Sequence, residues 1–272
     1  MIDENMTCDK KDIDATKTAS PPSDNNTIRS LLTPPEPIQS LEYLKEQISQ
    51  AADFRMQRKR PFIVISYAQS VDGSIAARNR APILLSGQES MRLTHHIRAC
   101  CDSILVGIGT VLADNPRLTV RLGAGKNPQP IILDTRLRTP IDSKLVKRSD
   151  LSSWIVNGKG NSQEKIDALQ NAGATVLSCA TAARGKIDLN TLMGLLIDKG
   201  INSIMVEGGA EVITSFVNEQ LVDQFVITIS PKLIGGLPVI DKRGLGVSSF
   251  LRLGNVEYQH LGDDLVMWAR PI

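Results

Sequence analysis

Residues 106–121 read VGIGTVLADNPRLTVR and residues 206–212 read VEGGAEV, and these two stretches decide the fold and the site that we expect. The second stretch leaves an apolar run, Ser203–Val206, passes through two glycines and enters an amphipathic segment at 210–219. A strand that turns through Gly-Gly into a helix leaves backbone N–H groups unpaired at the positive end of the helix dipole. Such a turn is typical of a phosphate or pyrophosphate site.

The first stretch follows another apolar run, Ser103–Gly107, and adds polar groups of three kinds. It carries a hydroxyl (Thr110), a carboxylate (Asp114) and two guanidiniums (Arg117 and Arg121). Guanidiniums bind phosphate oxygens through paired, charge-assisted hydrogen bonds. The two stretches together would offer partners to a doubly phosphorylated cofactor and to a phosphorylated substrate.

The composition excludes several classes of partner. The chain has 272 residues, 42% of them hydrophobic, and a formal net charge of +2, so nothing indicates nucleic-acid binding. Its apolar runs fall short of the roughly 18–20 residues that a membrane-spanning helix needs. Four cysteines, two of them adjacent, form no C-x-x-C pair and are expected to be reduced thiols. We expect a partner that is a small molecule.

The chain divides at about residue 38. Residues 1–38 are rich in polar residues and proline and are expected to be disordered or loosely packed, whereas 39–272 is expected to form one catalytic domain. The N-terminus lacks a signal-peptide pattern and carries acidic residues that argue against a transit peptide, namely Asp3, Glu4, Asp9, Asp12 and Asp14. The cytoplasm is therefore the expected location, with the nucleus left open.

From residue 40 onward, helical and strand patterns alternate. Helices are expected at 40–59 (capped by Ser40), 86–99 (opened by a capping box at 86–89), Gln163–Asn171, 188–199 and 210–219. Strands are expected at 62–68, Ser103–Gly107, 130–134, 153–157, Thr175–Ser178 and Ser203–Val206, with a terminal hairpin of 256–261 and 265–269. This order predicts an α/β fold with a mostly parallel central sheet flanked by helices and antiparallel C-terminal edge strands. The β-branched run 222–230 fits either a subunit contact or a covered internal strand.

Five expected strands end in small or polar residues, at 68–73, 107–110, 134–135, 157–158 and 207–209. Any one of these is ordinary turn chemistry. In open α/β sheets, however, ligands bind beyond the carboxyl ends of the strands, where all five should converge. The chain has no G-x-G-x-x-G, no P-loop and no zinc-deaminase motif. No metal is expected, and His95, His96 and His260 are assigned ordinary surface or packing roles.

A set of motifs in fixed order carries a specific resemblance. They are Ser70-x-Asp72-Gly73, the block GTVLADNP at 109–116, Leu118-Thr119-x-Arg121, Val206-Glu207-Gly208-Gly209 and Pro231-Lys232-x-x-Gly235-Gly236. Over about residues 60–270 the chain resembles the reductases of riboflavin biosynthesis, which have a dihydrofolate-reductase-like fold and use NADPH. Without a deaminase half, it is similar to the stand-alone fungal and archaeal type. That type reduces 2,5-diamino-6-ribosylamino-4(3H)-pyrimidinone 5′-phosphate, and the family's homodimers imply a homodimer here.

The resemblance assigns residues to two ligands. Matching positions expected to contact NADPH are Ala68, Leu84, Thr110, Asp114, Thr135, Gly208, Gly209, Ala210, Glu211 and Val212, within a run that extends to Ser215. Those expected to contact the substrate are Arg98, Leu118, Arg121 and Glu207, and the two guanidiniums, of Arg98 and Arg121, are suited to bind its 5′-phosphate. Leu84 stands where many bacterial relatives have an aromatic residue, and Pro82 where they often have serine.

The chemistry of such a reduction needs a carboxylate. The sugar carbon must be presented as an open-chain imine, whose protonated form a nearby carboxylate stabilises while hydride reaches C1′. Glu207 and Asp72 are the available acids, with the stronger assignment to Glu207. Arg136 and Lys159 are candidates for the 2′-phosphate of the cofactor. Two alternatives remain open: reduction of the deaminated uracil substrate, and a non-catalytic nucleotide-binding sensor.

Overall fold

A computed structural model describes residues 40–182, 185–240 and 251–272. These residues belong to one compact unit that spans 37–272. The disorder expected for 1–38 lies outside the described residues. None of the described helices is long and apolar enough to cross a membrane.

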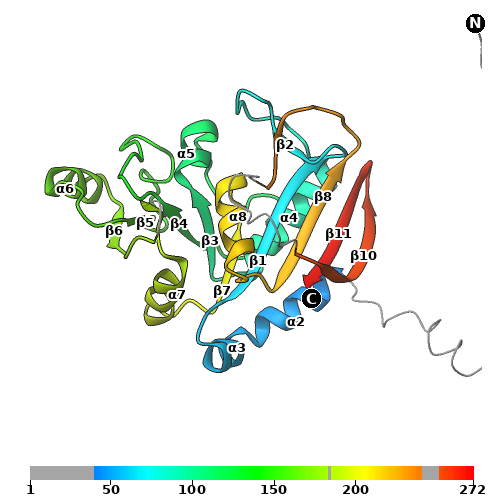
Figure 1. Ribbon diagram of the computed structural model, residues 1–272, viewed down its shortest axis with the longest axis horizontal. Coiled ribbons are helices and arrows are strands. Elements are labelled where there is room, and N and C mark those ends of the chain that lie inside the picture. Colours follow the sequence, from blue (N-terminus) through cyan, green and yellow to red (C-terminus); the bar gives the residue numbers. More distant parts are fainter. Residues whose placement is uncertain (1–39, 183–184, 241–250) are drawn as a thin grey trace, which may run out of the picture. The chain divides into compact units, whose positions relative to one another are not determined.

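The described residues form a nine-stranded sheet in the order β10-β11-β8-β1-β7-β3-β4-β5-β6 (Figure 1). The seven strands from β8 to β6 are parallel, and β11 and β10 add an antiparallel edge. This confirms the expected α/β class with antiparallel C-terminal edge strands. The strands are β1 Phe62–Ser70, β3 Ser103–Gly107, β4 Gln129–Leu133, β5 Trp154–Asn157, β6 Thr175–Ser178, β7 Ser203–Val206, β8 Gln224–Ser230, β10 Leu253–Leu261 and β11 Asp264–Pro271.

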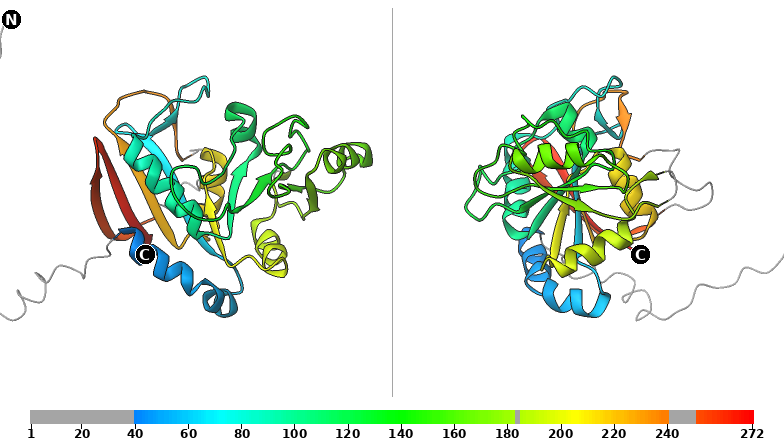
Figure 2. Two further views of the ribbon diagram at one scale, coloured as in Figure 1. Left: turned by 180° about the vertical axis from the view of Figure 1, so that it is seen from behind. Right: turned by 90° about the vertical axis from the view of Figure 1, so that its left-hand side faces the viewer.

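Helices cover both faces of this sheet (Figure 2). Because side chains alternate along a strand, Phe62 and Val64 of β1 pack towards α2, α3 and α4, while Ile63 and Ile65 pack towards α7 and α8. Apolar residues of β3, β4 and β5 form a further cluster with α5 and α6. The helices are α2 Ser40–Ser49, α3 Ala51–Arg58, α4 Gln88–Cys100, α5 Ile108–Asp114, α6 Gln163–Asn171, α7 Leu189–Asp198 and α8 Ala210–Asn218.

The structure corrects the expectations at both N-terminal helices. The helix expected at 40–59 is divided at Gln50 into α2 and α3, and Ser40 is already helical rather than a cap. The capping box at 86–89 is wrong, because the N-cap of α4 is Gly87 and no side chain of the box caps it. The Gly87 N–H instead donates to Asp264 Oδ2 of β11 at 2.7 Å. A tertiary contact thus replaces the local one.

The small β2–β9 sheet and helix α5 were not expected from the sequence, and the structure decides between the two interpretations of the run 222–230. β2 Ser74–Ala76 pairs with β9 Leu237–Pro238 in a small separate sheet, and α5 follows β3 directly. The run 222–230 contains β8, which lies between β1 and β11 inside the sheet. It is therefore a covered internal strand, and its apolar character gives no argument for a subunit contact.

Candidate active site

The carboxyl ends of β1, β7, β3, β4 and β5 lie on one edge of the sheet, because these strands are parallel neighbours. Each is followed by the small or polar residues that the sequence places there. The order of the strands puts β7, with Glu207 directly after it, between β1 and β3. The site can therefore draw on both stretches quoted first.

The Gly208-Gly209 turn opens as expected into a helix. Gly209 is the N-cap of α8, and the first bonds onto its carbonyl come from the N–H groups of Val212 and Ile213. Among the described residues, no acceptor faces the N–H groups of 208–211. A Cβ on Gly209 would lie 3.9 Å from Thr110 Oγ1, so the hydroxyl of the first stretch reaches this turn. Four free donors and a hydroxyl at a helix N-terminus suit an anion.

Two glycines allow Val212 of α8 to lie close to the end of β3 and to the turn after β7. A Cβ on Gly107 would come within 2.7 Å of the Val212 side chain, and one on Gly208 within 2.6 Å. Both distances are shorter than any normal van der Waals contact. Glycine is required at these positions for packing rather than for an unusual φ, and Val212 is thereby fixed beside the turn.

Glu207 forms a two-pronged ion pair with Arg98, which comes from the last turn of α4. Arg98 Nε donates to Oε1 and Nη2 to Oε2, each at 2.6 Å, and the two side chains are only 11% and 16% exposed. Arg98 Nη1 also donates to the carbonyl of Thr119 at 3.2 Å. Arg98 and Glu207 are thus brought together as expected, but as partners of each other. Arg98 is not a free cation awaiting a phosphate.

Arg121, unlike Arg98, forms no ion pair with a carboxylate of the described residues. Its side chain is exposed and Nη1 donates to Thr119 Oγ1 at 3.1 Å, while its backbone N–H donates to Nδ1 of His95 at 2.8 Å. Burial, followed by the charges of Arg98 and Arg121, lowers the pKa of His95 to about 4. His95 is therefore neutral near pH 7 and able to accept these hydrogen bonds.

From the sequence, His95 was expected to have only a surface or packing role. His95 is 2% exposed and lies one helical turn before Arg98 on α4. That i, i+3 spacing from an expected substrate residue is the signal that could have pointed to it.

The other residues expected at the site differ in burial and in contacts. Leu118 is 3% exposed and has a positive φ of 52°, and its side chain packs in the core. Leu84 is 73% exposed, and its carbonyl accepts a hydrogen bond from Lys232 Nζ at 2.7 Å. Thr135 lies beside Gly158, where a Cβ would meet its Cγ2 at 2.9 Å. Ala68 is half-buried near the end of β1, and Asp114 is exposed at the end of α5.

Asp72 is occupied by neighbouring donors. Its carboxylate accepts from the hydroxyls of Ser70 and Ser74 and from the backbone N–H groups of Ile234 and Gly235. These bonds, the one from Ser70 foremost, hold the pKa of Asp72 well below its usual range. A carboxylate so held stays ionised and anchors the segment 234–235 against the turn after β1. Its geometry favours this anchoring role over proton donation.

The described part of the chain contains no cluster of three or more His, Cys, Asp or Glu side chains suited to a metal ion.

A family profile described as the RibD C-terminal domain matches residues 61–267. The chain therefore belongs to the RibD C-terminal domain family. It is 33% identical over 224 residues to the 2,5-diamino-6-ribosylamino-4(3H)-pyrimidinone 5′-phosphate reductase of Archaeoglobus fulgidus, covering 78% of this chain and 98% of the relative. The reductase of the same name from Debaryomyces hansenii is 36% identical over 195 residues, covering 65% and 77%.

Longer relatives and solved structures agree with this. The riboflavin biosynthesis protein RibD of Aquifex aeolicus is 32% identical over 215 residues, and the match spans 58% of that protein. The structure of the Saccharomyces cerevisiae riboflavin biosynthesis reductase Rib7 superimposes with a TM-score of 0.62 at 27% identity, covering 82% of this chain and all of Rib7. Acinetobacter baumannii RibD gives a TM-score of 0.71 at 23% identity, covering 82% of this chain and 62% of that one. The fold is thus the fold of RibD reductases.

Proposed function

We propose that this protein reduces the ribosyl side chain of 2,5-diamino-6-ribosylamino-4(3H)-pyrimidinone 5′-phosphate to the ribitylamino compound, with NADPH as the hydride donor. The observation that carries the proposal is Glu207, paired with Arg98 and placed directly before the Gly208-Gly209 turn. Relatives that match nearly the full length of their own chains bear this activity as their name. The cofactor supplies hydride, and the residues of the chain bind, orient and stabilise charge.

The cofactor is assigned to the turn and its neighbours. The free N–H groups of 208–211 and the hydroxyl of Thr110 would hold the diphosphate. Leu84, exposed at the same edge, offers an apolar surface to a ring. Arg136 and Lys159 are exposed cations that follow β4 and β5, where a 2′-phosphate would distinguish NADPH from NADH. Ala68, Asp114 and Thr135 complete the proposed cofactor side.

Glu207 is assigned the acid–base side of the reaction. Opening of the ribosyl ring gives an imine at C1′, which becomes an electrophilic iminium when its nitrogen is protonated. The Glu207 carboxylate would stabilise that positive charge, and Arg98 fixes the orientation of the carboxylate. Hydride then adds to C1′, and the nitrogen keeps its proton as an amine. The C–N double bond becomes single, and one hydride and one proton account for the product.

The substrate phosphate is assigned to Arg121. Arg98 is committed to Glu207, whereas Arg121 forms no ion pair with any carboxylate of the described residues. Leu118 supports this segment from the core rather than touching substrate with its side chain.

Two alternatives are separated by one assay. The purified protein is mixed with NADPH and with either the diamino compound or its deaminated uracil counterpart, and the absorbance of reduced nicotinamide is followed. Faster consumption with the diamino compound supports the proposal. Preference for the uracil compound supports the second substrate, and consumption with neither, together with NADPH binding, supports a sensor.

A further inference from the structure

Residues 117–122, here named the arginine strap, present two exposed guanidiniums. Neither Arg117 nor Arg121 forms an ion pair with a carboxylate among the described residues. Partial burial and the positive charges of Arg98 and Arg117 lower the pKa of Arg121. The charge of Glu207 opposes this shift, but neither guanidinium is paired with a carboxylate of the described residues, and a bound dianion would relieve the remaining repulsion.

The inner side of the strap is fixed by α4. Nδ1 of His95 accepts the backbone N–H of Arg121 at 2.8 Å and, more weakly, that of Leu122 at 3.4 Å. Arg98 Nη1 holds the Thr119 carbonyl. His95 is buried and neutral, so its unprotonated Nδ1 fixes the backbone at Arg121 and thereby the direction of the Arg121 side chain.

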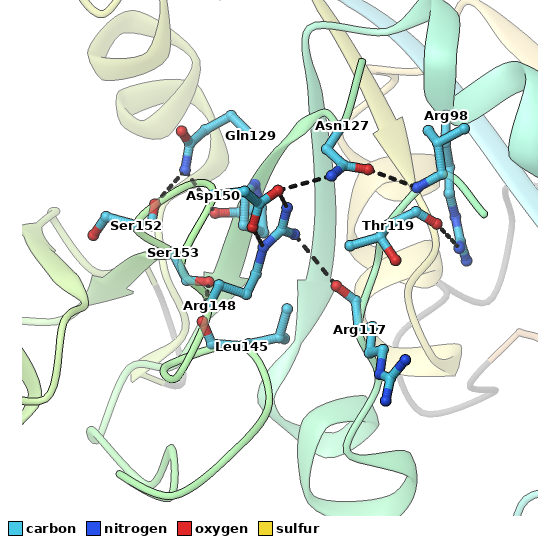
Figure 3. A network of polar contacts seen from close by, with 12 residues as sticks. Arg98, Arg117, Thr119, Asn127, Gln129, Leu145, Arg148, Asp150, Ser152 and Ser153 are labelled. Carbon is cyan, nitrogen blue, oxygen red and sulfur yellow. Dashed lines mark hydrogen bonds and ion pairs between the residues drawn. The ribbon is translucent and has the colours of Figure 1, made fainter. Parts of the chain in front are cut away.

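The outer side of the strap is fixed by a second group, Asn127, Arg148 and Asp150, here named the bracket (Figure 3). Asn127 Oδ1 accepts the Val120 N–H at 2.7 Å, and Asn127 Nδ2 donates to Asp150 Oδ2 at 2.7 Å. Both Asp150 oxygens accept from Arg148, whose side chain is only 5% exposed. Arg148 Nη1 then donates to the Arg117 carbonyl at 3.3 Å.

These contacts leave the strap little backbone freedom. Four backbone atoms of the strap each form a hydrogen bond with a different side chain, namely the carbonyls of Arg117 and Thr119 and the N–H groups of Val120 and Arg121. Leu118 is buried and has a positive φ. A loop already fixed in its bound shape loses little conformational entropy when a ligand binds. Two charged side chains on such a loop become a preformed anion site.

We propose that His95 and the bracket are positioning residues that preorganise the arginine strap for the phosphate of the substrate. This rests on the proposed function, since the phosphate in question belongs to the proposed substrate. These roles differ from a general packing role because His95, Asn127 and Arg148 act through hydrogen bonds to the strap backbone, and Asp150 acts by holding Asn127 and Arg148.

The first experiment measures the binding of ribose 5-phosphate and, separately, of NADPH to the full chain by titration calorimetry. His95→Leu removes the ring acceptor, whereas His95→Asn keeps an acceptor near the position of Nδ1. His95→Leu should weaken ribose 5-phosphate about tenfold, the effect of one lost hydrogen bond to a buried partner. His95→Asn should stay within about threefold of the wild type, and the NADPH affinity should be unchanged in both.

The second experiment breaks the bracket at an exposed residue, so that the fold is retained. Asp150→Asn should weaken the binding of ribose 5-phosphate and raise KM for the phosphorylated substrate, each about three- to tenfold, and leave kcat within about twofold. The matched control is Asp167→Asn, at an exposed aspartate on α6 that, among the described residues, accepts a hydrogen bond only from Gln163, and it should change none of these constants.

Three results would overturn the inference: wild-type affinity of Asp150→Asn for ribose 5-phosphate, wild-type affinity of folded His95→Leu, or a loss in His95→Asn as large as in His95→Leu. The last result would mean that packing, not the acceptor, matters. If the variants weaken ribose 5-phosphate as expected and the wild type reduces neither pyrimidine, the proposed function fails while the positioning role stands. The two failures are thus distinguishable.

Discussion

Glu207 has to satisfy two demands at once. It must be held in one orientation in a nearly buried position, and it must leave lone pairs for a cationic substrate. The bidentate contact with Arg98 meets the first demand, because two parallel charge-assisted hydrogen bonds fix the plane of the carboxylate. Each carboxylate oxygen has more than one lone-pair direction, so the second demand is met as well.

Glu207→Gln should lower kcat by about 100-fold or more while leaving the NADPH dissociation constant within about twofold. The amide keeps the shape and one acceptor for Arg98 but no longer stabilises a positive charge in the transition state. Stopped-flow nicotinamide absorbance and cofactor titration measure the two quantities. Glu164→Gln, an exposed change on α6, serves as the control. An unaltered rate would remove Glu207 from the mechanism.

His95 makes the stability of the protein depend on pH in a defined direction. In the unfolded chain a histidine titrates near 6.5, whereas in the folded chain the pKa of His95 is lowered to about 4 by burial and by Arg98 and Arg121. The folded state thus binds fewer protons between these values, so the stabilisation is complete above 6.5 and is lost as pH falls towards 4.

The free energy of unfolding should therefore fall between pH 6.5 and 4 in the wild type, and less so in His95→Asn. Urea unfolding at several pH values measures it. His260→Asn, at an exposed histidine of β10, should leave the wild-type slope in place. Equal slopes in all three proteins would show that His95 does not titrate as the structure indicates.

The residues of the site were foreseeable in kind but not in their pairing. The family resemblance assigned Arg98, Arg121 and Glu207 to the substrate, yet the Arg98–Glu207 bond joins positions 109 residues apart and depends on how α4 packs on β7. The buried side chain of Leu118 was missed for a related reason, since the backbone turn with positive φ that directs it inward leaves no pattern in the sequence.

The sequence predicted most accurately the bounds of those elements that are defined by a local residue pattern. The bounds of β3, β6, β7 and α6 agree with the expected ranges, because apolar runs and helical spacing define them. The cap of α4 was not foreseen, since its acceptor, Asp264, lies 177 residues away. The pairing of β2 with β9 is equally non-local. α5 contains glycine and β-branched residues of low helix propensity, so its formation depends on packing against β3.

The close contact between Val212 of α8 and the turn after β7 predicts a sharp difference between two glycine substitutions. Gly208→Ala would place a methyl group 2.6 Å from Val212 and push α8 away, raising KM for NADPH about tenfold and lowering stability by about 1–3 kcal/mol. Gly194→Ala on α7 meets no atom within 4 Å and should raise stability by about 0.5–1 kcal/mol. Steady-state kinetics and denaturant unfolding measure both. An NADPH KM unchanged in Gly208→Ala would contradict the assignment of the turn to the cofactor.

For the described domain as a whole, the two ends of the parallel strands differ in character. The candidate site lies at the carboxyl ends, whereas polar contacts stabilise the amino ends. There, Arg60 forms a two-pronged pair with Asp223, and Asp102 accepts the N–H groups of Asn202 and Ser203. Strand–helix alternation was enough to predict this architecture, because parallel strands require crossovers that cover both faces.

The family match begins at residue 61, yet the apolar core extends further towards the N-terminus. Leu44 of α2 and Ala51 of α3 are each 1% exposed and pack with Leu93, Ile97 and Trp268. Arg60 also lies 5.1 Å over the Phe54 ring. Removal of these helices would uncover the face of the sheet that also carries α4.

Two truncations test where the folding unit starts. Deleting residues 1–38 should leave kcat and the unfolding midpoint unchanged, because the core contacts of α2 and α3 are all retained. Deleting residues 1–60 should lower the free energy of unfolding by about 3–6 kcal/mol, since a buried leucine and several partly buried apolar side chains lose their partners. Denaturant unfolding and turnover of the same preparations measure the difference. A loss of activity in the shorter truncation would show that 1–38 contributes to the site. A longer truncation as stable as the wild type would show that α2 and α3 merely lie against a core that is complete without them.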